Sequence, residues 1–236
     1  MIGWCCTAFY PSCSRRLLVP PTHAADGESP HTLPVKKASV DFAAGYFNAS
    51  ADLFGPWDIP LTGGIFNVDG GMGLKKDVDL RFYLSDVEMD RDMTSGLNSS
   101  IHSAAMRLKW NPDANRAWAM TAGAGLGNSQ GLWYYSFEHS QILGFENKYF
   151  IPYLNARVMA NIPLTSRTIY LSGSYSKKPL PTLGFDGLMG FKIPLTHVVS
   201  YPPSLSFELG GGWLGDKRDD TKAILFDVKF EQPFDY

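Results

Sequence analysis

From Lys36 to the C-terminus, apolar and polar residues alternate along the chain with a period of two. In the segment 77–86 one face is apolar, formed by Val78, Leu80, Phe82 and Leu84. The segments 101–110 and 223–235 repeat this alternation. Successive side chains of a β-strand point to opposite faces, whereas the faces of a helix repeat about every 3.6 residues. Residues 40–47 are the main stretch that also fits helical spacing, so the pattern predicts an all-β fold.

Turns rich in polar residues, Gly and Pro separate the alternating segments. We therefore expect strands at residues 37–48, 63–74, 77–86, 101–110, 116–127, 148–162, 167–176, 184–193, 203–214 and 223–235. An even number of antiparallel strands brings both ends of the chain to the same side of a barrel. The prediction is a single antiparallel transmembrane β-barrel of about ten strands over residues 36–236.

An alternative with eight strands arises at residues 75–76, where the alternation does not change phase. The apolar parity of residues 66–74 continues onto residues 78–82, so residues 64–86 could form one long strand. Residues 37–62 would then be an N-terminal addition to an eight-stranded barrel.

The connections between the expected strands are of two kinds. Tight turns are expected at residues 111–115 and 163–166, and longer polar loops at residues 87–100 and 127–147. Short turns on one rim and longer loops on the other are typical of outer-membrane barrels.

Composition narrows the ways in which this chain can meet a membrane. No run of about 18 apolar residues occurs, which is the length that crosses a bilayer as a helix. A membrane-spanning form must therefore cross with strands. Aromatic residues make up 14% of the chain, with 23 Gly and 16 Pro, and this mixture suits short strands and many turns.

Residues 1–25 differ from the rest of the chain, since they contain all three cysteines and end in small residues before Asp26. We interpret them as a signal or an atypical leader, and the alternative is a disordered tail of the mature protein. Residues 26–35 are expected to form an extended tail. The formal net charge is −2, and it becomes −4 without the two charges of Arg15 and Arg16, so nothing predicts nucleic-acid binding.

The polar face of the expected strands combines charges of both signs with many small residues. Small residues suit a crowded interior, and enclosed charges must compensate one another. Aromatic residues gather near strand ends, where amphipathic rings favour a membrane interface. These features favour an exterior in lipid and a polar interior. The residues that we expect to line this interior are Arg81, Arg157, Glu208, Asp227 and Lys229.

The final segment, ILFDVKFEQPFDY, alternates and ends in an aromatic residue. The residues of its apolar parity are Phe226, Val228, Phe230, Phe234 and Tyr236. The segment resembles the C-terminal signal of bacterial outer-membrane β-barrels, with departures at Gln232 and Pro233. The resemblance is to small bacterial outer-membrane barrels as a class and not to one family. It implies location in the bacterial outer membrane, with membrane lipid and lipopolysaccharide as partners.

For function, we expect a structural barrel or a narrow channel for small solutes, gated by the interior charges. One alternative is a soluble or periplasmic barrel that binds a hydrophobic ligand. Another is a membrane-embedded lipid-modifying enzyme with Glu138, His139 and Ser140 as candidates, although consecutive side chains of a strand point to opposite faces. The spacing of His and Cys predicts no metal site, and no cofactor is expected.

A specific contact is also predicted between the last two strands. The short connection GDKRDDTK predicts that they pair antiparallel about Asp219. This register would place Glu208 opposite Lys229 or close to it, as an ion pair in the interior.

Overall fold

The computed structural model describes residues 28–51, 59–90, 99–112, 117–129, 132–145, 149–164, 169–171, 175–177, 180–196, 202–215 and 220–236. The strands are β1 (Lys37–Ala51), β2 (Ile59–Lys75), β3 (Val78–Asp90), β4 (Ser99–Trp110), β5 (Trp118–Ser129), β6 (Leu132–Gly144), β7 (Ile151–Pro163), β8 (Ile169–Leu171), β9 (Tyr175–Lys177), β10 (Thr182–Pro194), β11 (Ser204–Gly215) and β12 (Asp220–Asp235). No helix occurs in the described ranges, and hence none there that is long and apolar enough to cross a membrane. The predicted leader, residues 1–25, lies outside the described residues.

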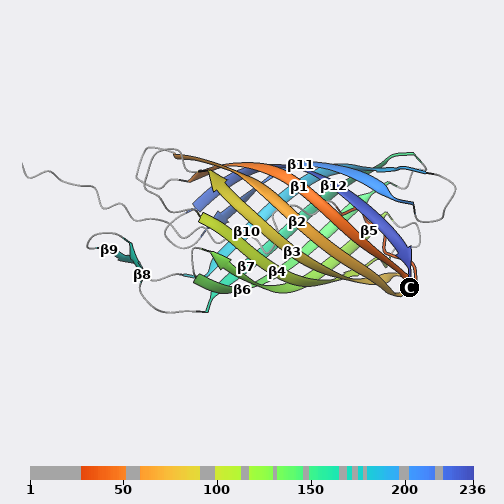
Figure 1. The fold of residues 1–236 in the computed structure, drawn as a ribbon, viewed down its shortest axis with the longest axis horizontal. Coiled ribbons are helices and arrows are strands. Elements are labelled where there is room, and N and C mark those ends of the chain that lie inside the picture. Colours follow the sequence, from red (N-terminus) through yellow and green to blue (C-terminus); the bar gives the residue numbers. More distant parts are fainter. Residues whose placement is uncertain are drawn as a thin grey trace, which may run out of the picture.

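Ten of these strands close into a barrel in the order β1-β12-β11-β10-β7-β6-β5-β4-β3-β2. Every neighbouring pair in the barrel is antiparallel. The strands are strongly tilted against the barrel axis (Figure 1). The antiparallel ten-stranded barrel that the alternation predicts is therefore confirmed.

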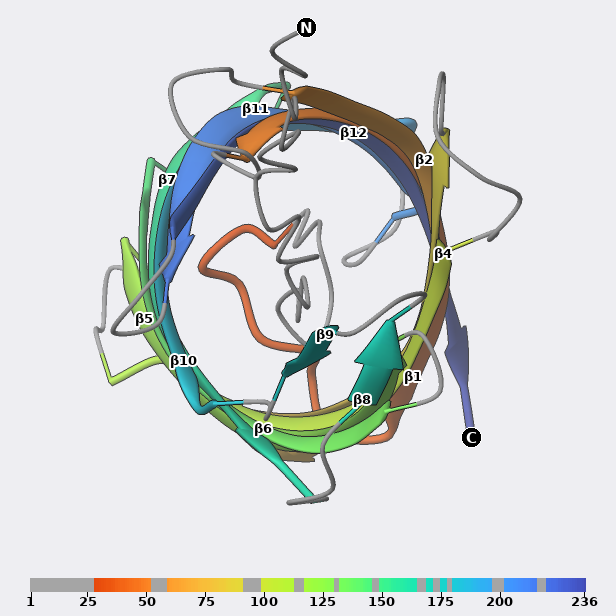
Figure 2. The same cartoon turned by 90° about the vertical axis from the view of Figure 1, so that its left-hand side faces the viewer.

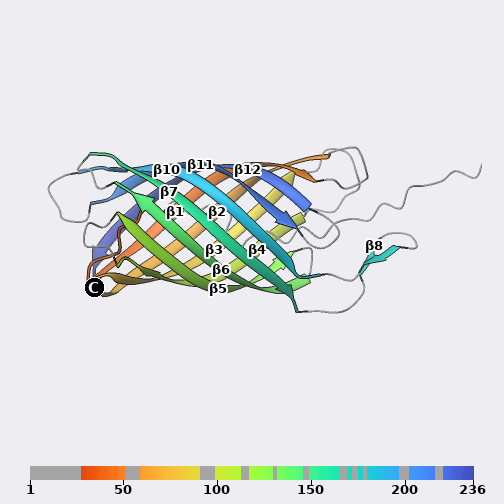
Figure 3. The same ribbon diagram turned by 180° about the vertical axis from the view of Figure 1, so that it is seen from behind.

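The two rims of the barrel differ in what they carry. β1 begins beside the end of β12, with Lys37 paired to Asp235, so both strand ends lie at one rim, which we call the terminal rim. The opposite rim is called the distal rim. The small sheet of β8 and β9 lies beyond the distal rim, outside the barrel (Figures 1 and 3).

The eight-stranded alternative is wrong, because the chain turns back at Lys76 and Asp77 between β2 and β3. Met72 pairs with Leu80 across this hairpin, so residues that face each other are both even-numbered. A hairpin with such pairing keeps the apolar phase across its turn. Alternation alone therefore did not distinguish the hairpin from one long strand.

The predicted barrel strand at residues 167–176 is also wrong. Its described parts belong to β8 and β9, which pair with each other and not with the barrel. The barrel strand that follows β7 is β10, which begins at Thr182, so the turn predicted at residues 163–166 does not join two barrel strands; residues 165 and 166 lie outside the described residues.

The polar stretch at residues 127–147 was expected to be a loop, but it contains β6. β5 continues to Ser129, and β6 begins at Leu132. The inward residues of β6 include Ser136, Glu138 and Ser140. Because of these polar residues, the whole stretch resembled one long polar loop. The strand nevertheless alternates between buried and exposed residues along its whole length.

The barrel wall is apolar outside and polar inside. Outward residues near mid-strand are large and exposed, for example Leu84, Met106, Phe137, Leu209 and Phe226. The buried side chains with charges are Glu28, Asp41, Asp69, Asp79, Arg81, Arg107, Lys109, Glu138, Arg157, Asp186, Lys192, Glu208, Asp227, Lys229 and Glu231. A soluble barrel has the opposite polarity, so the exterior of this wall is the face that meets lipid.

This polarity predicts the labelling of introduced cysteines at two adjacent positions of β3. Leu84 is 61% exposed on the outside and Ser85 is 5% exposed on the inside. In a background with Cys5, Cys6 and Cys13 changed to Ser, Leu84→Cys should react with a membrane-soluble maleimide in liposomes. Ser85→Cys should be protected from the same reagent. Mass spectrometry of the labelled protein measures both, and faster labelling at position 85 would show that the faces are assigned the wrong way round.

Candidate functional site

The interior of the barrel contains a segment of the chain itself, residues 28–35, which we call the plug. Figure 2 looks along the barrel axis and shows this segment, in red, inside the ring of strands. Glu28 and Leu33 are 2% and 0% exposed. The sequence analysis predicts an extended tail for residues 26–35 and does not predict that this tail enters the barrel.

A tight turn at the terminal rim joins the plug to β1. Lys36 has a φ of 65°, in the left-handed region, and the Lys37 amide donates a hydrogen bond of 3.0 Å to the Pro34 carbonyl. Val35 forms an isolated parallel bridge with Gly73 of β2. This turn reverses the chain, so the plug runs back into the interior instead of leaving the barrel.

Two inward glycines of β2 make room for the plug. A Cβ at Gly73 would lie 2.1 Å from the Pro34 carbonyl oxygen, and a Cβ at Gly71 would lie 2.7 Å from Leu33 Cδ1. Real Cβ atoms do not approach other atoms so closely, so a larger residue at Gly73 displaces the plug backbone, and one at Gly71 forces the Leu33 side chain to move. The wall is therefore shaped to receive this segment.

The inner end of the plug is held by charged and polar side chains of the wall. The Tyr83 hydroxyl donates to Glu28 Oε1, and Arg107 Nη1 lies 3.4 Å from the same oxygen. Lys109 Nζ lies 3.4 Å from Glu28 Oε2 and donates a 2.6 Å hydrogen bond to the Ser29 carbonyl. The Glu28 carboxylate thus meets donors from two adjacent strands, β3 and β4.

Further polar contacts hold the rest of the plug. Asn111 Nδ2 donates to the Pro30 carbonyl at 2.8 Å, and the Leu33 amide donates to Asp79 Oδ2 at 2.9 Å. Water that enters the barrel when the plug leaves can take over hydrogen bonds and ion pairs of this kind. The plug is thus attached largely through contacts that can be exchanged for water.

Beside the plug, one group of interior charges is centred on Asp41 of β1. Arg81 Nη1 lies 2.9 Å from Asp41 Oδ2, and Lys229 Nζ lies 3.2 Å from the same oxygen. Lys229 Nζ is also 3.1 Å from Asp69 Oδ2. Arg81 Nη2 lies 3.6 Å from Glu231 Oε1, which extends the group to the terminal part of β12. Each cation here is close to more than one carboxylate, as burial of charge requires.

A second group of interior charges is centred on Glu138 of β6. Arg107 donates to Glu138 Oε1 through Nε at 2.9 Å and Nη2 at 2.8 Å. Arg157 Nη1 lies 3.8 Å from Glu138 Oε2, and Arg157 donates to Asp186 Oδ2 through Nε at 2.9 Å and Nη2 at 2.6 Å. Arg107 also contacts Glu28, so this group joins the wall to the plug.

The residues that the sequence analysis assigns to the interior are all buried inside the barrel: Arg81, Arg157, Glu208, Asp227 and Lys229. The structure brings Arg81 and Lys229 together on one Asp41 oxygen. Arg157 belongs to the group around Glu138 instead.

The predicted pairing of Glu208 opposite Lys229 is wrong. In the observed register Glu208 lies opposite Asp227, and Lys229 lies opposite Ser206. β12 begins at Asp220, earlier than the alternation suggested, so the connection is shorter and the pairing shifts. The Lys229 ammonium is within ion-pair distance of Asp41 and Asp69, as described above.

Other interior charges were not predicted: Glu28, Asp41, Asp69, Glu138, Asp186 and Lys192. Asp41, Asp69, Asp186 and Lys192 fall on the polar parity of strands that were predicted, so parity could have identified them. Glu138 lay in the segment expected to be a loop. Glu28 lay in the expected tail, where no periodic pattern points to the interior.

The candidate catalytic set of the lipid-modifying enzyme does not assemble. Glu138 and Ser140 face the interior, whereas His139 is exposed on the outer face. His139 Nε2 lies 2.6 Å from Gln141 Nε2, and Trp118 Nε1 donates to Gln141 Oε1 at 2.8 Å. Among the described residues, no His, Cys, Asp and Glu side chains are grouped so as to hold a metal ion.

Toward the distal rim, one side of the interior becomes apolar. Phe47, Ile65, Val87 and Ile101, from β1 to β4, form a buried cluster near the distal ends of these strands. The other side stays polar, since Ser136 of β6, Asn161 of β7 and Thr182 of β10 are buried and joined by hydrogen bonds. The interior therefore has the plug on the terminal side, a charged zone beside and beyond it, and a distal part that is apolar only over β1 to β4.

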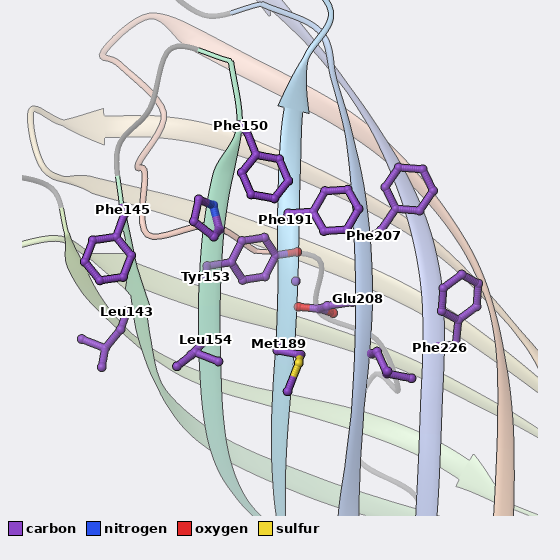
Figure 4. Close-up of a pocket in the computed structure, with 13 residues that line it drawn as sticks. Leu143, Phe145, Phe150, Tyr153, Leu154, Met189, Phe191, Phe207, Glu208 and Phe226 are labelled. Carbon is purple, nitrogen blue, oxygen red and sulfur yellow. The ribbon is translucent and has the colours of Figure 1, made fainter.

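The outer surface carries a hollow of about 530 Å³ over β6, β7, β10, β11 and β12, shown in Figure 4. The rings of Phe150, Phe191 and Phe207 form a row along it, with centroid distances of 5.0 Å and 5.1 Å. Most of its lining is apolar and lies on the lipid-facing side of the wall. Acyl chains of the surrounding membrane suit such a surface.

The sequence matches no protein-family model and no curated protein. The COG4313 outer membrane channel from Pseudomonas putida F1 has a similar structure, with a TM-score of 0.54 and 11% identity over 89% of this chain and 100% of that chain. Neisserial surface protein A gives a TM-score of 0.40 and 17% identity over 82% and 96% of the two chains. The N-terminal β-barrel domain of OprF from Pseudomonas aeruginosa gives 0.34 and 13% over 85% and 100%.

At such low identities, the likeness concerns the fold. The fold is that of small bacterial outer-membrane β-barrels, as the C-terminal pattern predicted. Together with the apolar exterior, it confirms the predicted class and the location in the bacterial outer membrane.

Proposed function

We propose that this outer-membrane barrel is a narrow channel for small solutes and that the plug closes it. The observation that carries this proposal is that the plug, a segment outside the wall strands, lies inside the barrel and is held there by polar contacts to the wall. A barrel closed by its own wall side chains cannot open without repacking its wall. A barrel closed by a separate segment opens when that segment leaves.

The chemistry of the wall also supports passage of water-soluble solutes. The side chains around the plug are ionised or hydroxylated, so water and small polar solutes can solvate them once the plug is displaced. A soluble barrel that stores a hydrophobic ligand needs an apolar chamber instead. The charged zone of this interior is unsuited to such a ligand, which argues against that alternative.

A purely structural barrel is the second candidate. The observation that favours it is the two groups of ion pairs around Asp41 and Glu138, each of which links neighbouring strands along the wall. Such a network can rigidify a barrel without conducting anything. For either role we propose membrane lipid, lipopolysaccharide included, as the partner of the apolar exterior.

The channel proposal predicts that Gly73→Val opens the barrel. The new Cβ would lie 2.1 Å from the Pro34 carbonyl oxygen, so the side chain and the plug cannot both keep their positions. Overpacking of about 1–3 kcal/mol should raise the ratio of open to closed channels by about five-fold to a hundred-fold. Conductance in planar lipid bilayers measures this ratio. Gly70→Val is the matched control, because a Cβ there has only the Ser39 carbonyl within 4 Å, at 3.9 Å.

A disulfide between plug and wall provides the opposite test. A Cβ at Gly144 would lie 2.8 Å from Pro30 Cγ, so the plug and the wall are in contact here, and Pro30→Cys with Gly144→Cys is the pair to cross-link. In the background without Cys5, Cys6 and Cys13, the oxidised protein should not conduct, and reduction should restore the openings. Equal conductance before and after reduction, with no effect of Gly73→Val, would leave the structural barrel as the better description.

A further inference from the structure

We propose that Tyr83, Arg107 and Lys109 form a binding site for small carboxylate solutes, and that the Glu28 side chain of the plug occupies this site in the closed state. The inference rests on the proposed channel function, since solutes in transit reach the site only when the plug leaves. It adds the chemical class of the solute and a reason why the plug carries a carboxylate at its inner end.

The three wall residues converge on both oxygens of one carboxylate. Arg107 and Lys109 are two residues apart on β4, so their side chains share the inward face, and Tyr83 lies on the neighbouring β3. Tyr83 and Arg107 meet Glu28 Oε1, and Lys109 meets Oε2. All four side chains are buried, so the site is enclosed by protein and not a patch of surface cations.

The wall holds two of these donors, Arg107 and Tyr83, in place independently of the plug. Glu138 of β6 binds Arg107 through Nε and Nη2, which directs Nη1 toward Glu28. The Arg107 guanidinium carbon also lies 4.7 Å from the centre of the Tyr83 ring. Donors that are fixed before a ligand arrives bind it with a smaller loss of conformational entropy. The site should therefore persist after Glu28 has withdrawn.

The charge balance of the site selects a singly charged ligand. In the closed state Glu28 is the carboxylate that bridges Arg107 and Lys109, while Glu138 holds the other side of the Arg107 guanidinium. The group now bound there is a planar carboxylate with one negative charge. A small monocarboxylate reproduces these contacts, whereas a neutral amide leaves the charge of Lys109 uncompensated.

Solute and plug then compete for the same donors. Glu28 and the solute both bind these donors through a carboxylate. A bound solute therefore keeps Glu28, at the inner end of the plug, out of the site. A solute that binds the open state more tightly than the closed state shifts the equilibrium toward the open state. The size of the shift is set by the difference between the two affinities. The solutes that the channel transports would thus displace the plug.

Binding of ¹³C-labelled acetate to the full-length protein in detergent micelles tests this inference, with acetamide as the neutral probe. Broadening of the acetate carboxyl resonance during a titration gives the affinity. Glu28→Gln should bind acetate about ten-fold more tightly than the wild type, because the competing charge is gone. Thr32→Ala, a change elsewhere in the plug, should bind like the wild type. Glu28 lies outside the wall strands, so we expect Glu28→Gln to fold. Heat-modifiable gel migration checks that each variant is folded.

Three further changes in the Glu28→Gln background locate the site. Lys109→Gln and Tyr83→Phe should each weaken acetate binding by about ten-fold, and Lys109→Arg should retain most of it. Equal acetate affinity in the wild type and Glu28→Gln would overturn the inference, as would equal binding of acetate and acetamide. If acetate binds as expected and Gly73→Val does not conduct, the carboxylate site stands and the channel proposal fails. If Gly73→Val conducts and Glu28→Gln does not bind acetate, the reverse holds.

Discussion

Replacing Lys229 by Met should destabilise the folded barrel by about 3–5 kcal/mol, the usual cost of removing one partner from a buried ion pair. Lys229 Nζ lies within 3.2 Å of both Asp41 and Asp69, deep in the interior. Without the ammonium, two carboxylates are left close together in a space that excludes much of the water. Arg81 still neutralises Asp41 at 2.9 Å, so Asp69 bears most of the loss.

The free energy of unfolding is measured by urea titration of the protein in liposomes. Heat-modifiable gel migration reports the folded fraction at each urea concentration. Lys222→Met is the matched control, since Lys222 lies on the same strand and is exposed to the outside, where we expect a change within about 0.5 kcal/mol. The double variant Lys229→Met/Asp69→Asn should be less destabilised than the sum of its single changes, by at least about 1 kcal/mol. Strict additivity, or a cost no larger than that of Lys222→Met, would rule out a buried pair between Lys229 and Asp69.

The polarity of the wall could be predicted because the alternation within each strand is enough to determine it. Each strand has one face in lipid and one in a charged interior, so parity assigns a residue to a face without knowledge of its partners. Arg81, Arg157, Glu208, Asp227 and Lys229 were assigned to the interior in this way. All five are buried inside the barrel.

Parity does not determine register, and the error at Glu208 shows why. Pairing about Asp219 differs from the observed pairing of Glu208 with Asp227 by about two residues. A slip of two residues keeps every side chain on its own face. The hydrophobic pattern is the same in both registers, and only the partners change. Contacts between particular charges were therefore beyond the reach of alternation.

The assignment of strands failed where inward and outward residues were both polar. β6 carries Glu138 and Ser140 inside and His139 outside, so three consecutive polar residues interrupt its pattern. Closure of the barrel holds this strand in place through its neighbours β5 and β7. Its strand conformation thus depends on tertiary pairing more than on its own sequence.

The plug was beyond local prediction for a different reason. Residues 28–35 have no periodic pattern, and their position depends on partners far along the chain, such as Asp79 and Lys109. The signal that the sequence did contain was Gly71 and Gly73, inward glycines of a wall strand. Glycine inside a strand often marks the close approach of another backbone, and at Gly73 that backbone is Pro34 of the plug.

The lipid-facing side of the wall gives the second large expected effect. Met106 is 52% exposed on the outer face of β4, beside its cross-strand partner Phe82. Met106→Arg should destabilise the barrel by about 2–4 kcal/mol, because a guanidinium near the bilayer midplane loses its hydration. Met106→Leu introduces no charge and keeps a similar volume, so it should destabilise the barrel by less than about 1.5 kcal/mol.

Depth in the membrane, and not the outward direction alone, should determine this cost, and β4 provides an internal comparison. His102 lies four residues from Met106 on the same face, about 10 Å nearer the distal rim for a tilted strand. Its Nδ1 is 3.0 Å from Asp86 Oδ1, and both side chains are exposed, so this position already accommodates polar groups. His102→Arg should therefore cost no more than about 1 kcal/mol, as at a membrane interface. Urea unfolding in liposomes measures both variants, and equal costs at positions 102 and 106 would mean that the apolar belt does not end between them.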